Sequence, residues 1–193
     1  MKATTTLLTF ATVAMLWSCG SSNSTDTTEM ADSTNEAMAD SAETTGTGTA
    51  AAEEDSDFAI EAANGGMTEV QLGEVAKQKG TNPKVKEFGE MMVTDHTKAN
   101  NELKALAASK NITLPAAPNE EMQKATADIS SKNGKDFDKA YIDQMVKDHQ
   151  KTVELFEDGQ KNVKDPEIKA FIDKTLPVLK SHLEHVKTLD KAK

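Results

Sequence analysis

Residues 88–96 read FGEMMVTDH, and residues 141–149 read YIDQMVKDH. The two stretches match at an offset of 53, with an aromatic residue at the start and Met-Val-x-Asp-His at the end. Each lies in a longer segment whose apolar residues recur every three or four positions, which is the period of an amphipathic α-helix. The stretches therefore look like copies of one element in a pair of related helical hairpins.

The helical period continues through the chain from Asp57 onward, without β-branched runs or strict alternation. Asn82 and Asp165 are good N-cap residues, and each is followed by a proline at the first helical position. Pro177 lies inside the last periodic segment and predicts a kink there. The pattern predicts four long helices, over residues 57–79, 82–109, 136–161 and 165–189.

The lengths of the connections predict how these helices are arranged. About three residues separate the first helix from the second and the third from the fourth, and such short connections place helices antiparallel. About 25 residues join the second helix to the third, and they include a short amphipathic segment at Met122, Ala125 and Ile129. We therefore predict an all-α fold over residues 57–193, a ferritin-like four-helix bundle of two antiparallel hairpins joined by a long crossover that contains a short helix.

The N-terminal segment predicts export and a lipid anchor. Residues 1–18 have Lys2 followed by an apolar stretch of about eleven residues, which is typical of a signal peptide and too short to span a bilayer. The stretch ends Leu16-Trp17-Ser18-Cys19, which resembles the lipobox of bacterial lipoproteins. In that family Cys19 would carry the acyl chains that bind the membrane. Gly20 stands where an Asp would retain such a lipoprotein in the inner membrane, so the resemblance implies the outer membrane of a Gram-negative bacterium.

A polar, acidic segment follows the predicted anchor. Residues 20–56 hold nine acidic residues and no basic one, and they contain no Leu, Ile, Val or Phe. Such a composition buries too little apolar surface to offset the entropy of ordering. We therefore predict that residues 19–56 comprise the lipidated Cys19 and a disordered tether.

Charge and cysteine content exclude several classes of function. The formal net charge is −10 and the chain has no arginine, so a nucleic-acid partner is not expected. The single cysteine excludes an internal disulfide. No glycine-rich phosphate loop or nucleophile elbow is present, so no catalytic residue is predicted.

Four polar residues interrupt the buried faces of the four predicted helices. His96, His149 and His182 each fall near the middle of an apolar stripe, and Glu69 falls in the small-residue face of the first helix. One carboxylate and three imidazoles suit a transition metal such as Zn, Cu or Fe. Methionines four residues before two of the histidines, Met92 and Met145, would favour copper.

A purely structural reading of the same residues stays open. Inward histidines usually hydrogen-bond to a neighbour, and buried polar networks fix helix register. Asp95 and Asp148 are candidates to hold His149 and His96, respectively, across the bundle. His185 could join either kind of site, although it lies nearer the edge of its stripe.

The chain resembles the domain of unknown function 4142 family of bacterial envelope proteins. The resemblance is carried by Phe58-Ala59 through Leu72-Gly73, Val85 through Phe88 and Met92 through His96, Phe137 through Tyr141 and Met145 through His149, and Leu176 through His182. It implies a ferritin-like fold and an outer-membrane location. No Glu-x-x-His motif precedes His96, His149 or His182, which argues against di-iron chemistry.

Two functions from different classes follow from these patterns. The first is a membrane-tethered envelope lipoprotein with a non-enzymatic role in binding, sensing or stress, which could include binding a metal. The second is a metal-dependent enzyme or metal-storage module that uses Glu69, His96, His149 and His182. A scaffold that binds an unidentified protein partner through its exposed helices is a third, weaker hypothesis.

Overall fold

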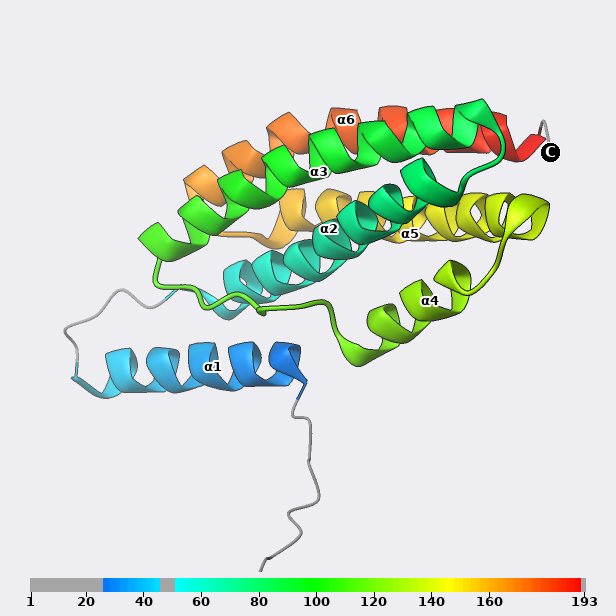
Figure 1. Cartoon of the computed structure of the whole chain (residues 1–193). Helices are drawn as coiled ribbons and strands as arrows, with labels where there is room; N and C mark the ends of the chain where they lie inside the picture. The colour runs from blue at the N-terminus through cyan, green and yellow to red at the C-terminus, as the bar shows by residue number, and fades with distance from the viewer. Residues whose placement is uncertain (1–25, 46–50, 192–193) are drawn as a thin grey trace, which may run out of the picture.

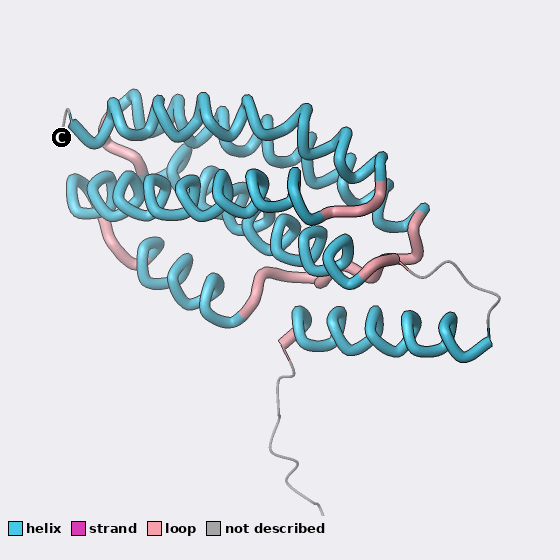
Figure 2. The backbone as a smooth tube through the Cα atoms, turned by 180° about the vertical axis from the view of Figure 1, so that it is seen from behind, coloured by secondary structure: helices cyan, strands magenta, loops and turns pink. Residues whose placement is uncertain are grey.

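A computed structural model of the chain describes residues 26–45 and 51–191. Within these residues the protein is all-helical and contains no strand (Figures 1 and 2). Four of the helices are long and two are shorter. The helices are α1 (Thr27–Thr45), α2 (Glu53–Lys79), α3 (Pro83–Ser109), α4 (Glu120–Ser130), α5 (Gly134–Asn162) and α6 (Pro166–Lys191).

The long helices α2 and α3 form an antiparallel pair. Gly80, just after α2, lies against Val85 at the start of α3, whereas Gly66 in the middle of α2 lies against Asn100. The predicted N-cap is confirmed, because the Asn82 side chain accepts a hydrogen bond from the backbone N–H of Lys84. The short connection therefore turns the chain back on itself, as the sequence predicted.

Helices α5 and α6 form the second antiparallel pair. Gly159, near the end of α5, lies against Ile172 in the early part of α6, and His149 lies against His182 further along. Helix α6 continues through Pro177 without a break. The two pairs pack together through α2 against α5 and α3 against α6, so the connection between α3 and α5 runs the length of the helices and carries α4 (Figure 1).

Apolar side chains form two clusters along the axis of the four long helices. One cluster contains Phe58, Phe156 and Phe171, and the other contains Phe88 and Tyr141. Residues at intermediate positions along the helices, including the polar stripe residues, lie between the two clusters. The apolar clusters thus hold the helices in register on both sides of the candidate site.

A buried aspartate at the start of each helix pair binds the short loop that connects the two helices of the other pair. The carboxylate of Asp138, in the first turns of α5, accepts hydrogen bonds from the backbone N–H groups of Thr81 and Asn82. The carboxylate of Asp55, in the first turn of α2, accepts from those of Lys164 and Asp165. These two sets of contacts relate α2 to α5, whereas the sequence repeat relates α3 to α5. Helix α2 begins at Glu53, four residues before the start that the sequence predicted.

Helix α1 differs from the disordered tether predicted for this part of the chain. Ala31 is buried, and Thr28 and Asn64 of α2 exchange hydrogen bonds. Asn35 pairs with both backbone groups of Thr113 in the crossover. The composition argument counted only large apolar side chains, whereas α1 packs through alanine and is held by polar side chains. Residues 53–56 of the predicted tether belong to α2. Its residues 19–25 and 46–50, which include Cys19, lie outside the described residues, as does the predicted signal peptide.

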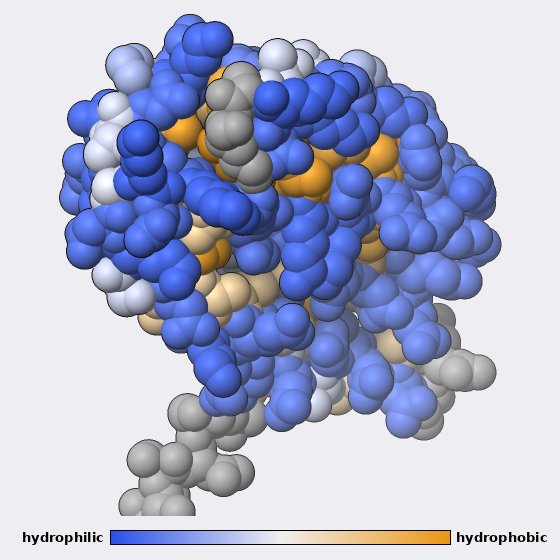
Figure 3. All heavy atoms as spheres, turned by 90° about the vertical axis from the view of Figure 1, so that its right-hand side faces the viewer, coloured by the Kyte–Doolittle hydropathy of each residue, from blue (hydrophilic) through white to orange (hydrophobic). Residues whose placement is uncertain are grey.

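One face of the described part is mainly hydrophilic. Figure 3 shows the end of the molecule that carries the α2–α3 connection, where hydrophilic side chains cover most of the surface and apolar ones are visible between them. None of the described helices combines the length and the apolar character that a membrane span requires.

Candidate metal centre

One polar residue from each long helix reaches the middle of the bundle. Glu69 comes from α2, His96 from α3, His149 from α5 and His182 from α6. Their exposed fractions are 1%, 4%, 0% and 2%, respectively. The structure therefore brings together all four residues that the sequence singled out as candidate ligands.

The three imidazoles form a compact group, which we call the imidazole cluster (His96, His149 and His182). One ring nitrogen from each histidine lies within 4.8 Å of the corresponding nitrogens of the other two. The ring centroids are 5.4–5.6 Å apart. These separations are close enough for a single ion to contact all three nitrogens after small side-chain adjustments, given metal–nitrogen distances of about 2 Å.

Glu69 lies beside this cluster and not within it. Its Oε2 is 2.9 Å from Nδ1 of His96, and its Oε1 is 3.3 Å from Nδ1 of His149. The sequence predicted Glu69 as a fourth ligand. In the structure its carboxylate instead lies against the Nδ1 atoms of two imidazoles, and Glu69 is not part of the group whose ligand atoms lie within 4.8 Å of one another.

The second ring nitrogen of each histidine also has a partner. His149 Nδ1 lies 3.0 Å from the carbonyl oxygen of Met145, and His182 Nε2 lies 2.9 Å from Oδ2 of Asp95. Metal-binding histidines commonly donate their remaining N–H to a carboxylate or a backbone carbonyl in this way. Each imidazole of the cluster is thus held by one nitrogen, which leaves the other directed elsewhere.

The nitrogens on the opposite edges have no such partner. His96 Nε2, His149 Nε2 and His182 Nδ1 are buried and make no hydrogen bond to any described residue. Buried polar atoms without partners are rare in folded proteins, and each requires an explanation. Three such nitrogens on neighbouring histidines fit a bound cation. A neutral imidazole has one nitrogen without a proton, and the lone pair of that nitrogen can bind a metal.

Burial and charge act differently on the members of the site. Burial alone would raise the pKa of Glu69, but attraction to His96 and His149 outweighs it and lowers this pKa to about 2. Burial lowers the pKa of His149, and it lowers the pKa of His182 to about 4 despite the hydrogen bond with Asp95. Burial also acts to lower the pKa of His96, but the adjacent Glu69 carboxylate outweighs it and raises this pKa. The site therefore combines an ionised carboxylate with one imidazole that favours the charged form and two, His149 and His182, that favour the neutral form in which imidazole binds metals.

The remaining residues singled out from the sequence have other places. Met92 and Met145 are fully buried in the apolar cluster that contains Phe88. His185 is exposed, with its ring 5.4 Å from that of Phe88. None of these three belongs to the imidazole cluster.

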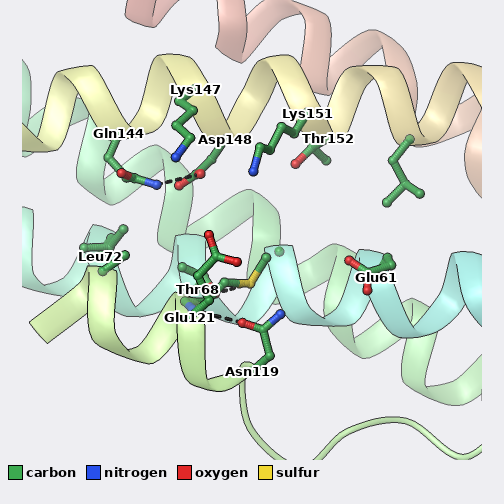
Figure 4. A pocket seen from close by; sticks show the side chains of 14 residues that line it. Glu61, Thr68, Leu72, Asn119, Glu121, Gln144, Lys147, Asp148, Lys151 and Thr152 are labelled. Atoms are coloured by element: carbon green, nitrogen blue, oxygen red, sulfur yellow. Dashed lines mark hydrogen bonds between the residues drawn. The ribbon is translucent and has the colours of Figure 1, made fainter. Parts of the chain in front are cut away.

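The predicted aspartate partners were wrong. Asp95 contacts His182 and not His149, because it faces α6 across the α3–α6 seam. Asp148 accepts a hydrogen bond from Gln144 and lies in a cleft of about 410 Å³ between α2, α4 and α5 (Figure 4). The sequence repeat identified both aspartates but could not show which helix each of them faces.

Comparison with known sequences assigns the family. Residues 28–189 match the family described as "Domain of unknown function (DUF4142)". The chain belongs to the DUF4142 family. The match includes most of α1 as well as the four long helices, so the DUF4142 region is longer than residues 57–193. No protein of curated function is significantly similar in sequence to this DUF4142 protein.

Solved structures share the helical fold of the DUF4142 protein. A DUF305 fragment from Deinococcus radiodurans matches with a TM-score of 0.65 and 10% identity, over 74% of this chain and 99% of the fragment. CopM in its Cu(I)-bound form matches with a TM-score of 0.60 and 18% identity, and in its Cu(II)-bound form with 0.58 and 17%. Both CopM matches cover 72% of this chain and 96% of CopM. At these identities the similarity establishes the fold alone.

Proposed function

We propose that this DUF4142 protein binds a divalent transition metal through His96, His149 and His182. The observation that carries the proposal is that one ring nitrogen of each of these three buried histidines lies within 4.8 Å of those of the other two, in a cluster where each imidazole has a buried nitrogen without a hydrogen-bond partner among the described residues. Glu69 and Asp95 orient the imidazoles from outside and supply two negative charges. Those charges balance a divalent ion, which favours a 2+ metal over a monovalent one.

The unpartnered nitrogens also distinguish this proposal from a purely structural polar network. A network that serves only to fix helix register gains most when every buried donor and acceptor is paired. Here each of the three histidines has a buried ring nitrogen without a hydrogen-bond partner among the described residues, and both carboxylate oxygens of Glu69 lack one as well. Helix register alone does not explain so many buried polar atoms without a hydrogen bond, whereas a cation would give the imidazole nitrogens a partner.

Copper(II) is the metal that we expect to bind most tightly. Imidazole ligands suit Cu²⁺ and Zn²⁺, and Cu²⁺ is the stronger binder in the general order of divalent ions. CopM, whose helical fold is similar, is described in Cu(I)- and Cu(II)-bound forms. The methionines lie outside the cluster, so the ligand set resembles a Cu²⁺ site more than the thioether-rich sites that favour Cu⁺.

We propose metal binding, storage or sensing in preference to catalysis. The cavity that Glu69 and His96 line measures only about 20 Å³, which is room for one water molecule and not for a substrate. We also propose that the four long helices form a ferritin-like bundle, but the histidines lack the Glu-x-x-His pattern of di-iron proteins. An enzyme that uses the same residues remains the alternative, and steady turnover of a substrate by the metal-loaded protein would favour it.

Metal analysis of matched histidine variants tests the proposal. His149→Asn keeps a donor near the Met145 carbonyl and removes the inner nitrogen, while His185→Asn makes the same change at an exposed histidine. We expect one Cu²⁺ per wild-type chain by elemental analysis and calorimetry, unchanged binding in His185→Asn and at least a tenfold weaker affinity in His149→Asn. Equal affinities in all three proteins, or a wild-type protein that binds no metal, would refute it.

The location of the protein is a separate proposal. We propose that Cys19 is lipidated and anchors the domain to the outer membrane of the cell envelope, on the basis of the lipobox-like sequence before it. Cell fractionation tests this proposal, with Cys19→Ser as the variant. The wild-type protein should sediment with membranes and the variant should be released; a variant that stays in the membrane fraction would exclude anchoring through this residue.

A further inference from the structure

We propose that the metal reaches the imidazole cluster across the seam between α3 and α6, and that Asp95 is the carboxylate that receives it. The inference rests on the proposed metal binding and adds a route and a residue to it. It starts from a simple problem of access. Every side chain of the candidate site is at least 95% buried, so a hydrated ion needs a group that meets both solvent and the cluster.

Asp95 is such a group. Its side chain is 40% exposed, whereas the side chain of His182, which it contacts at 2.9 Å, is 3% exposed. The ion pairs and hydrogen bonds of Glu69, His96 and His149 within the described residues are with one another and with the backbone of Met145. Among the residues that the structure describes, Asp95 is thus the partly exposed carboxylate in contact with a cluster imidazole.

The α2–α3 side of the site is closed by close packing. A Cβ added to Gly73 would lie 2.8 Å from the carbonyl oxygen of Gly89, so the two backbones already touch one turn from Glu69. On the α4 side, the cleft of about 410 Å³ is lined by Thr68 and Asp148, but by none of the three histidines and not by Glu69. An ion in this cleft would still be separated from the cluster, whereas an ion at Asp95 would lie beside His182.

His182 connects the seam with the interior. Its Nε2 faces Asp95, and its buried Nδ1 has no partner among the described residues. The other two histidines are paired through Nδ1, so His182 is the imidazole that faces the opposite way. A cation attracted to the Asp95 carboxylate is therefore already beside the ring whose other nitrogen belongs to the cluster.

The sequence repeat supplies a matched control for Asp95. Asp148 precedes His149 as Asp95 precedes His96. Burial raises the pKa of Asp148 to about 6, so at pH 8 both aspartates are ionised and carry the same charge. Asp148 nevertheless pairs with Gln144 in the cleft under α4 and with none of the three histidines (Figure 4). Replacing either aspartate by asparagine changes the net charge of the chain equally, but only one replacement alters the α3–α6 seam.

The test measures Co²⁺ binding to the full chain at pH 8 by stopped-flow absorbance, because Co²⁺ bound by imidazoles has visible bands. Asp95→Asn should slow the association rate constant about tenfold or more, and Asp95→Glu should restore most of it. Asp148→Asn should stay within about twofold of wild type. A wild type without Co²⁺ bands would overturn the proposed function itself. Three outcomes with normal wild-type bands would overturn the route through Asp95. They are an unchanged association rate constant in Asp95→Asn, a change in Asp95→Asn confined to faster dissociation, and an equal slowing of association in Asp148→Asn.

Discussion

Replacing Glu69 with glutamine should strongly destabilise the metal-free protein at pH 7. The carboxylate is 1% exposed and lies 2.9 Å from His96 Nδ1 and 3.3 Å from His149 Nδ1. Burial opposes its ionisation, yet attraction to the histidines lowers its pKa from 4.5 to about 2. At 1.36 kcal/mol per pKa unit, this difference corresponds to about 3 kcal/mol of net favourable interaction. The free energy of unfolding of a typical domain is about 5–15 kcal/mol, so this interaction is a large part of it.

The amide of glutamine cannot replace these contacts. Its oxygen can accept from one imidazole, but its NH₂ group then meets the N–H of the other. The pH dependence of stability has a defined sign, because the pKa of Glu69 is lower in the folded state. The stabilisation is complete above pH 4.5 and is lost as the pH falls toward about 2. The difference in stability between wild type and Glu69→Gln should therefore narrow over that window.

Urea unfolding followed by helical circular dichroism at pH 7 and pH 3 measures both effects. Glu102→Gln is the matched control, because Glu102 forms an exposed pair with Lys174 on the surface of the same bundle. We expect this control to change the free energy of unfolding by less than about 1 kcal/mol. A Glu69→Gln protein as stable as the control at pH 7, or a difference that does not narrow at pH 3, would refute the electrostatic reasoning.

Two further predictions concern helix packing. Gly73→Ala should lower the free energy of unfolding by about 1–3 kcal/mol, because its Cβ would press on the Gly89 backbone. Gly65→Ala should not lower it, because the nearest neighbour of its Cβ would lie at 3.7 Å. Thermal unfolding of both variants checks this prediction, and equal melting temperatures would contradict it. Burial and neighbouring acids raise the pKa values of Asp57 and Glu61 in the folded protein above their usual 3.8 and 4.5. Docking of α1 should therefore weaken as the pH rises above these usual values, because both carboxylates then ionise in a place that disfavours their charge. Hydrogen exchange of α1, corrected for the intrinsic effect of pH, should show protection falling over that range, and constant protection would show that these carboxylates do not oppose docking.

The sequence predicted most of the fold because helical periodicity and capping are local properties. Asn82 with Pro83, and Asp165 with Pro166, identified the starts of two long helices. The same reasoning missed α1, which depends on Thr28 and Asn35 finding partners far along the chain. Distant hydrogen bonds leave no periodic signal in the segment that makes them.

The candidate site shows the same division. A histidine in the middle of an apolar stripe must point into the bundle, so the sequence alone determined that His96, His149 and His182 are buried polar residues on separate helices. Only the tertiary structure decided that ring nitrogens of all three lie within 4.8 Å of one another, that Glu69 contacts two of the imidazoles, and that Asp95 faces His182. The physical reason is that periodicity fixes the direction of a side chain about its own helix, whereas the axial register and the choice of neighbouring helix are set by packing between segments far apart in the sequence.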